Sequence, residues 1–512
     1  MIRRILILSV ALAAVCSCYQ DLSTVAYRTL PEIEISGVPD SLETLYGDQI
    51  DLSAVATLDG KPYDGFVYEW AIDLRPGVSA DRIELSETAD VSFRVSNNPN
   101  EVPYCLSFSA TDPETGLSKM VFCHVFVRSS LGEGLLVAHT TDGGATSDFD
   151  LLACRAVTYG FNTDVPRYTR GIYALANGEP LQEKVNAVLP VVRSDGAVYN
   201  ETYVLVGTDS HLYALDPLTF KIVKQDAALF NGFKESAFKV NSLVNYGQIM
   251  TAAQINNQLY LNICHTNNVF NKAGYAGIPS DVFTPTNLGY AYAVQQSDVA
   301  FFNEAEGQFY YMHAQFSGYG SFSVIGESVE ANLAGGKSLW GGAGKEGRCA
   351  FLIEAADKSR HIYYIHPSDK ELVHYTLDGS KWHDDVKYFA FCDNADVLFM
   401  ASDKKIYSVA ISGGSPIYRD IAWSPEESGE IITGIKFYTQ GWYGSHGFDL
   451  NTYPFILATN RMQIIICTYN ESTGEGKIYL RPFNVSTGMF TFKDNGVYRG
   501  FGRITAITST YK

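Results

Sequence analysis

Several features that mark other protein classes are scarce or missing in this 512-residue sequence. No apolar run of 18 or more residues follows residue 17, which excludes a later membrane-spanning helix. No long stretch shows the 3.6-residue periodicity of an amphipathic helix, so a helical fold is excluded. Basic residues are the minority: 38 Lys and Arg stand against 56 Asp and Glu, a net charge of −18. This charge argues against nucleic acid and anionic lipid headgroups as partners.

Motifs for catalysis and metal binding are missing too. His361 and His366 lie five apart in one expected strand, so their side chains point to opposite faces. No closely spaced cysteine pair follows residue 18. Residues 443–447 depart from a nucleophile elbow, and residues 341–345 lack the spacing of a phosphate loop. The sequence therefore predicts no catalytic residue, no metal and no cofactor, although a pair of carboxylates assembled from any two blades of a propeller stays open.

What the sequence has in excess is aromatic residues, with 33 Tyr and 29 Phe. Such residues favour strands, so we expect an all-β protein. A polar residue, a large apolar residue and then tyrosine recur six times, first in His211-Leu212-Tyr213. The repeated tyrosines are Tyr213, Tyr260, Tyr310, Tyr363, Tyr407 and Tyr479. Their spacings are 47, 50, 53, 44 and 72 residues. A period in the range of about 40–50 residues with strand chemistry is typical of the blades of a β-propeller.

The propeller is expected over residues 131–512, with seven blades and with six or eight as alternatives. The stretch Gly207–Asp216 resembles quinoprotein-type propeller repeats, but one good copy does not imply that cofactor. The seventh blade is expected to use 455–459, 464–469, 477–482 and 489–492. Arg503–Ile507 resembles Glu430–Ile435 but has no blade after it, so we expect it to complete the first blade and close the ring.

Residues 32–129 predict a smaller domain of short strands, an immunoglobulin-like sandwich with Trp70 in its core. The expected strands are 32–36, 49–57, 66–73, 91–95, 104–110 and 120–127. Cys105 and Cys123 bracket the turn 112–116, and a regular hairpin would set them opposite each other. A cross-strand disulfide and two separate buried thiols both stay open, since one bulge would break the pairing.

The N-terminus reads as a signal for export. Two basic residues and about eleven apolar ones form a signal peptide over residues 1–17. Its end, Val15-Cys16-Ser17-Cys18, resembles the lipobox of bacterial lipoproteins, which implies that Cys18 becomes the lipidated first residue of the mature chain. The alternative is an ordinary secretion signal with incidental cysteines. Residues 18–31 are then a tether.

Taken in order, four stretches resemble the PKD-like family of lipoproteins: Cys18–Asp21, Leu30–Gly37, Gly47–Leu52 and Tyr68–Trp70. The resemblance implies a PKD-like sandwich and a lipid anchor in the outer membrane, at the cell surface or on the periplasmic face. It also implies partnership with a TonB-dependent transporter and its substrate-capturing lipoprotein. The expected function is binding of a peptide or glycan nutrient without catalysis. A propeller enzyme acting on glycans, a hydrolase or lyase, is the first alternative, and a non-catalytic scaffold is the second.

Aromatic residues in glycine-rich loops are the candidate ligand-binding residues. They are Trp442, Tyr443, Tyr319, Trp340 and Tyr275. Flat rings on loops stack on sugars or hold peptide side chains. The alternative is that these rings pack beneath their own long loops. The sequence leaves open whether the ligand is a peptide or a glycan, and it leaves open the oligomeric state.

Overall fold

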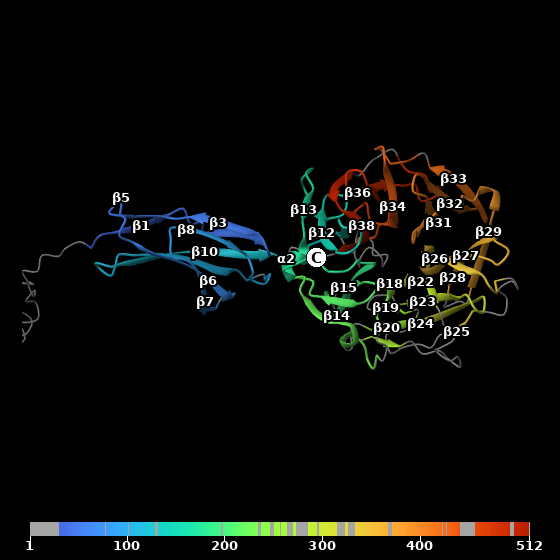
Figure 1. Cartoon of the computed structure of the whole chain (residues 1–512), viewed down its shortest axis with the longest axis horizontal. Helices are drawn as coiled ribbons and strands as arrows, with labels where there is room; N and C mark the ends of the chain where they lie inside the picture. Colours follow the sequence, from blue (N-terminus) through green and yellow to red (C-terminus); the bar gives the residue numbers. More distant parts are fainter. Residues whose placement is uncertain are drawn as a thin grey trace, which may run out of the picture. The chain divides into compact units, whose positions relative to one another are not determined.

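The structure is a computed structural model, and it shows an all-β protein (Figure 1). It describes residues 30–510 except 77, 101, 129–131, 196–197, 234–236, 246–249, 257, 264–269, 273–284, 294–295, 315–322, 326–332, 367–370, 422, 426, 441–455 and 492–495. Within these ranges no helix is both long enough and apolar enough to cross a membrane.

The chain divides into two compact units. Unit 1 comprises Met1–Leu42, Gln49–Arg94 and Val102–Phe126, and unit 2 comprises Glu43–Asp48, Val95–Glu101 and Val127–Lys512. The limits predicted from the sequence, 32–129 and 131–512, stay predictions.

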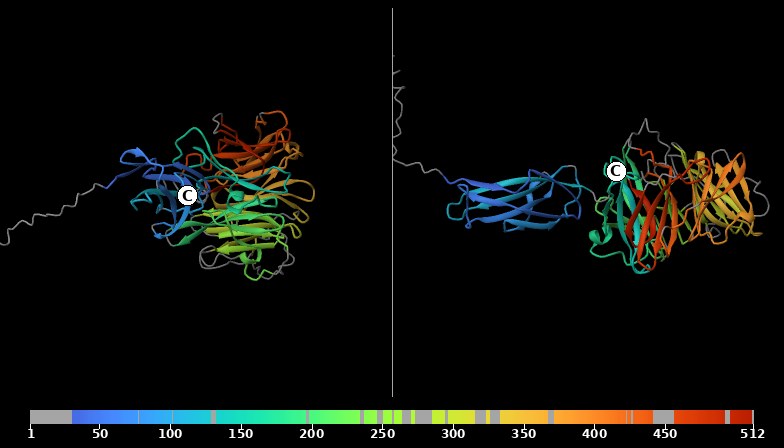
Figure 2. Two further views of the ribbon diagram at one scale, coloured as in Figure 1. Left: turned by 60° about the vertical axis from the view of Figure 1, so that its left-hand side comes forward. Right: turned by 90° about the horizontal axis from the view of Figure 1, so that it is seen from above.

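The strands before residue 129 form three antiparallel sheets (Figure 2). The largest has the order β2 (Ser41–Leu45), β10 (Ser118–Arg128), β9 (Tyr104–Thr111), β6 (Val67–Arg75) and β7 (Val78–Ser86). The others are β1 (Ile33–Ser36), β4 (Val55–Leu58) and β5 (Lys61–Pro62), and β3 (Gln49–Ser53) with β8 (Asp90–Arg94). Each of the six expected strands has a counterpart, whereas β2, β5 and β7 were not expected.

The core of unit 1 contains Trp70, as the sequence predicts. Its side chain is fully buried, packs against Phe108 with ring centroids 4.8 Å apart, and donates its indole N–H to the Ala89 carbonyl. The expected strand 49–57 is two strands, because the chain leaves the β8 partner at Ala54 and pairs with β1 instead. Ile50, Ala54 and Ala56 are nevertheless buried and Leu52 is half-buried, so these apolar residues keep to one face with a period of two across the break.

Cys105 and Cys123 are separate free thiols, which is the second of the two alternatives; Cys123 is buried and Cys105 half-buried. Cys123 is opposite Leu106, and Cys105 is opposite His124. The offset is set at the turn, where Thr111 is opposite Ser118, the Asp112 N–H donates to the Leu117 carbonyl and the Asp112 carbonyl accepts from the Gly116 N–H. A shift of one residue places the two side chains on opposite faces of the sheet.

The strands of unit 2 form seven four-stranded antiparallel sheets within the described residues. We number these blades 1 to 7 and count strands from the one nearest the ring centre. Blade 1 is β38 (Arg503–Thr510), β11 (Gly134–Thr140), β12 (Asp148–Ala153) and β13 (Arg167–Thr169). Blade 2 is β14 (Ala187–Asp195), β15 (Val198–Gly207), β16 (Leu212–Leu215) and β17 (Ile222–Gln225). Blade 3 is β18 (Val240–Asn245), β19 (Met250–Ile255), β20 (Gln258–Ile263) and β21 (Asn271–Lys272).

The remaining blades repeat this order. Blade 4 is β22 (Pro285–Ala293), β23 (Gln296–Asn303), β24 (Gln308–Ala314) and β25 (Ser323–Val324). Blade 5 is β26 (Lys337–Gly344), β27 (Arg348–Glu354), β28 (Arg360–His366) and β29 (Glu371–Leu377). Blade 6 is β30 (Tyr388–Phe391), β31 (Val397–Ala401), β32 (Ile406–Ser412) and β33 (Ser415–Ile421). Blade 7 is β34 (Glu430–Phe437), β35 (Gln463–Asn470), β36 (Glu475–Pro482) and β37 (Val497–Phe501).

Helical segments in the described chain are short. The α-helix α2 spans Ile172–Asn177, and three single 3₁₀ turns span Asp226–Leu229, Lys345–Gly347 and Gly379–Lys381.

The seven sheets form a ring. Each first strand contacts the first strand of the next blade, and β34 contacts β38 (Figure 1). Sheets of four antiparallel strands arranged radially in this way make a β-propeller. The predicted seventh blade needs a correction: its first strand is β34, not 455–459, and its fourth is β37, not 489–492.

The repeated tyrosines all occupy the same place in their blades. Each lies on the third strand, and each side chain is buried. The period in the sequence therefore marks one structural position.

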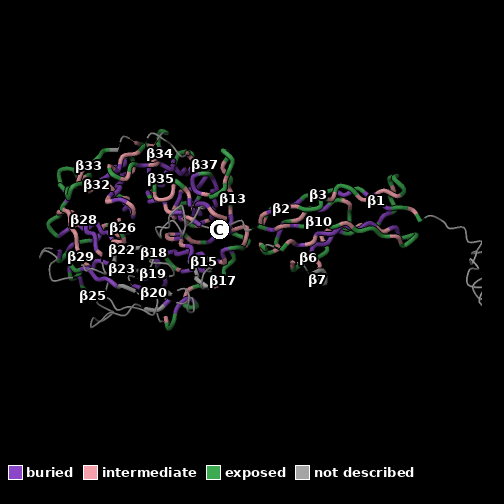
Figure 3. Tube along the Cα trace, turned by 180° about the vertical axis from the view of Figure 1, so that it is seen from behind, coloured by how far each residue is buried: buried purple, intermediate pink, exposed green. Residues whose placement is uncertain are grey.

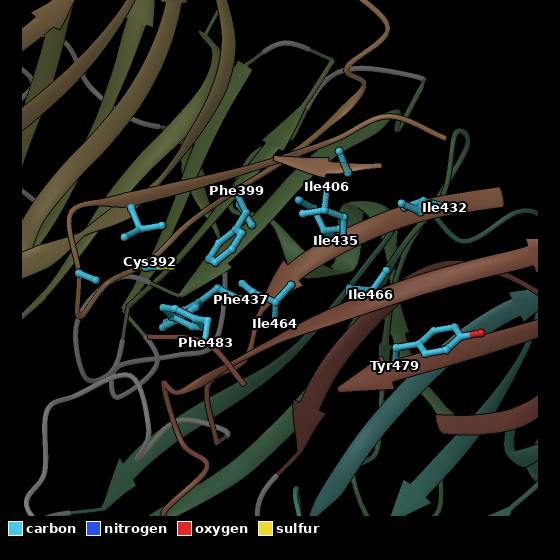
Figure 4. Close-up of a cluster of buried hydrophobic side chains, with 14 of the residues drawn as sticks. Cys392, Phe399, Ile406, Ile432, Ile435, Phe437, Ile464, Ile466, Tyr479 and Phe483 are labelled. Carbon is cyan, nitrogen blue, oxygen red and sulfur yellow. The ribbon is translucent and has the colours of Figure 1, made fainter. Parts of the chain in front are cut away.

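Both faces of a blade are covered by its neighbours, and the buried strands of the ring are purple in Figure 3. One cluster joins blades 6 and 7 through Phe399, Ile406, Ile432, Ile464 and Tyr479 (Figure 4). Equivalent clusters join blades 1 and 2, and blades 7 and 1. Burial on both faces explains why the strands read as nearly continuous apolar runs.

Ring closure follows the prediction from the sequence. The strand β38 pairs with β11, where Ile507 is opposite Val137 and Ile504 is opposite His139. This pairing completes blade 1 and removes the open edge that β11 would otherwise present.

Deleting Arg503–Lys512 should therefore destabilise all of unit 2. Ile504 and Ile507 are buried, and burying such a side chain contributes about 1.5–3 kcal/mol. We expect a melting temperature several degrees lower and a broader transition by circular dichroism. Removing residues 511–512 alone is the control, because it leaves β38 intact. Equal melting of the deletion and the full chain would contradict this account.

Candidate functional site

The structure describes one of the five aromatic residues selected from the sequence. Tyr275, Tyr319, Trp442 and Tyr443 lie outside the described residues, as does Cys18. Trp340 is described, and the aromatic rings near it form the candidate site.

Trp340 lies on a strand, which corrects the expectation that it sits in a loop. It is on β26, the first strand of blade 5, just after a register shift between Ser338 and Trp340. After this shift Trp340 is 39% exposed. Gly341 and Gly342 follow it and add no side chains beside the ring.

The Trp340 indole rests on other rings. Its centroid is 6.5 Å from that of Phe389, which is buried, and Phe389 stacks on Trp382 at 6.3 Å and 22°. The Arg360 guanidinium lies 4.3 Å from the Trp382 centroid and forms an ion pair of 2.9 Å with Glu354. We call Trp340, Phe389 and Trp382 the aromatic wall. Because Phe389 and Trp382 are held from several sides, Trp340 has a firm base, and a supported ring with an open face suits stacking on a ligand.

A polar cluster that was not selected from the sequence lies on blade 1. Asp148 and Asp150 are two apart on β12, so they share a face, and His139 on β11 is opposite Asp148. Asp150 accepts from Arg170 at 2.5 Å and lies 3.1 Å from the His139 Nε2. Burial opposes the ionisation of Asp150, but His139 and Arg170 outweigh it and hold the pKa of this carboxyl below its usual value.

Asp148 is also fully engaged. Its Oδ1 accepts backbone N–H groups from Phe149, Tyr173 and Ala174, and thereby fixes the start of α2 to blade 1. Burial raises the pKa of Asp148 above its ordinary value. The two carboxylates thus carry hydrogen bonds that join β11, β12 and the start of α2.

Lys436 is a further residue that was not selected from the sequence, and it lies near the ring centre. It lies on β34, a first strand, and its Nζ donates to the Ile507 carbonyl of β38 at 2.7 Å. Lys436 is an exposed residue, although many protein atoms surround its ammonium group. This loss of hydration lowers the pKa of its ammonium group to about 8. The sequence indicates a strand near Lys436, but it gives no sign that the ammonium group would contact β38.

No family model matches the chain, and no curated protein is similar to it. The solved structures that are similar to this chain include the following three. One is a quinoprotein alcohol dehydrogenase-like protein from Bacteroides thetaiotaomicron, with 13% identity, 93% of this chain and 100% of that chain covered, and a TM-score of 0.43. Another is apo AztD from Citrobacter koseri, with 10% identity, 87% and 98% coverage, and a TM-score of 0.36. The third is the complex of SREBP–SCAP binding domains from fission yeast, with 9% identity, 62% and 92% coverage, and a TM-score of 0.32. The activities in these names belong to those proteins.

The Lys436 environment predicts a specific dependence of stability on pH. An unfolded lysine has a pKa of about 10.4, so between pH 8 and about 10.4 the unfolded chain binds more protons than the folded one. The contribution of Lys436 to stability therefore increases as the pH rises through this window. Lys436→Met should raise the melting temperature relative to wild type most strongly below pH 8, and this difference should shrink towards pH 10.

Lys404→Met, at an exposed lysine of unit 2, is the matched control and should show no such trend. The hydrogen bond lost from Lys436 to Ile507 lowers the stability of the variant by an amount that changes little with pH. A difference between Lys436→Met and wild type that stays constant from pH 7 to pH 10 would contradict the lowered pKa.

Proposed function

We propose that this protein is a lipid-anchored binding protein of the outer membrane or cell surface. In this proposal, an immunoglobulin-like or PKD-like sandwich carries a seven-bladed propeller, and the propeller captures a peptide or glycan nutrient. It then serves as an accessory to a TonB-dependent importer and its substrate-capturing lipoprotein. No chemical conversion of the ligand is needed.

The observation that carries the proposal is the supported, open ring of Trp340. Trp340 is 39% exposed, so its indole offers flat apolar area on which a ligand can stack. Phe389 lies beside the Trp340 indole and is itself stacked on Trp382, so part of the rotamer freedom of Trp340 is already restricted before a ligand stacks on it. The lipobox around Cys18 and the PKD-like stretches of the sequence support the anchor and the partners.

The alternative of a propeller enzyme acting on glycans needs a free carboxylate pair. The Asp148 and Asp150 pair is taken up by His139, Arg170 and backbone N–H groups, which favours binding over hydrolysis. A scaffold that holds other proteins without a small ligand would leave the aromatic wall without a role. Turnover of a glycan by the wild type would favour the enzyme.

Trp340→Ala should weaken ligand capture without unfolding the protein. One stacked ring contributes about 0.5–1.5 kcal/mol beyond area burial, so affinity should fall about two- to tenfold. The measurement is a binding screen with soluble polysaccharides and a tryptic digest of casein, followed by calorimetry with the tightest binder. Tyr159→Ala removes another exposed ring of unit 2 and should leave affinity unchanged. Equal affinities of Trp340→Ala and wild type would rule out the aromatic wall as the binding surface.

Cys18→Ala should release the protein from the membrane fraction. Only Cys18 occupies the lipidation position of the lipobox, so labelling with a fatty-acid analogue should disappear in this variant. Cys16→Ala is the control and should remain labelled and membrane-bound. A Cys18→Ala protein that keeps its label would show that the anchor lies elsewhere.

A further inference from the structure

Two histidines lie side by side on the outer strands of blade 5. His361 on β28 is opposite Thr376 on β29, and Tyr363 is opposite His374. Residues two apart on a strand share a face, and so do directly opposed residues. All four side chains therefore project from the same face of the blade.

The nitrogen and oxygen atoms of three of these side chains form a nearly regular triangle. His361 Nδ1 is 3.3 Å from His374 Nε2, and Thr376 Oγ1 is 3.2 Å from the first nitrogen and 3.3 Å from the second. A tetrahedron with edges of this length has its centre about 2.0 Å from each corner, which equals the bond length between zinc and an imidazole nitrogen. The three atoms are thus spaced as one face of a tetrahedral metal site.

Hydrogen bonds set the protonation of the His361 ring. Its Nε2 is 2.7 Å from the Ser359 hydroxyl, and that hydroxyl donates to Asp357 Oδ1 at 2.6 Å. Because the Ser359 hydrogen is directed to Asp357, the hydroxyl oxygen accepts from Nε2–H of His361. The Nδ1 atom then carries the lone pair, and this atom faces His374.

The hydrogen bonds from His361 to Ser359 and from Ser359 to Asp357 are of the kind that usually orients a metal-binding histidine. Such a histidine donates its second N–H to a neighbouring oxygen, which fixes its tautomer and orientation. The Ser359 hydrogen bond also holds the pKa of Asp357 below its usual value, so the chain ends on an anion. The His374 ring is fixed differently: it stacks on Tyr363 at 5.1 Å and 17°.

We propose that His361 and His374 bind a divalent transition-metal ion, with Thr376 and water completing its coordination. Two imidazole ligands favour zinc or copper over magnesium or calcium, which prefer oxygen. Within the described chain, no three His, Cys, Asp or Glu side chains gather as a metal site. The site therefore has only two strong ligands, and His361 and His374 both keep contact with solvent. It is an exchangeable site rather than a permanently filled structural one.

The test is a titration of the full-length protein with Zn²⁺ and, separately, with Cu²⁺, in which isothermal titration calorimetry measures the binding. His361→Ala and His374→Ala should each remove one binding event or weaken it at least tenfold. Ser359→Ala should weaken it about tenfold, which is typical for loss of a supporting hydrogen bond. His366→Ala is the matched control: it lies on the same strand with its side chain on the opposite face, and binding should be unchanged.

Electron paramagnetic resonance gives a second readout. Cu²⁺ bound to the wild type should show coupling to two imidazole nitrogens, and Cu²⁺ bound to either histidine variant should not. His361→Gln and His374→Gln serve as conservative variants if an alanine variant unfolds. If folded variants bind both ions as tightly as the wild type, or if the wild type binds neither, the contact is an ordinary hydrogen bond between imidazoles. The proposal is independent of the proposed nutrient-binding function.

Discussion

A buried tyrosine on the third strand is the constraint that shapes six of the seven blades. Its ring fills the space between neighbouring sheets, and its hydroxyl must find a hydrogen-bond partner because burial without one is costly. In blade 7 the partner is Glu430, which accepts from Tyr479 at 2.9 Å, and Glu430 in turn lies 3.5 Å from the buried Lys477. In blade 4 the partner of Tyr310 is Glu306. Polar networks inside the ring thus follow from satisfying these hydroxyls.

The sequence was most informative where one structural position repeats. The tyrosine period predicted the blades, and the similarity of Glu430–Ile435 to Arg503–Ile507 predicted ring closure. The sequence was least informative where the register between two strands decides which residues lie opposite each other. The turn after Asp112 offsets Cys105 from Cys123 by one residue, and composition carries no signal for that choice. The error in blade 7 has another cause. Residues 455–459 were assigned as its first strand, whereas the first strand is β34, which lies earlier in the chain.

The site was harder to predict than the fold, because its parts come from different strands. Trp340 was selected from its glycine-rich surroundings, but Phe389 and Trp382, which support it, are distant in sequence. Searching along one strand compared His361 with His366, whereas the neighbour of His361 is His374 on the next strand. Pairs across a sheet depend on register, which one sequence does not specify. The tyrosine at 363 was read only as a blade marker, yet it also orients His374.

The pairing of β38 with β11 also bears on how the protein acquires its structure. Thr505 on β38 and Ala138 on β11 are joined by a hydrogen bond although they are 367 residues apart. At about 5–20 residues per second of synthesis, blade 1 waits on the order of 20–70 s for its missing strand. During that time β11 presents an unpaired edge that other chains could join. Blades 2 to 7 use only strands close in sequence and can assemble first, so the first blade begun is the last one finished.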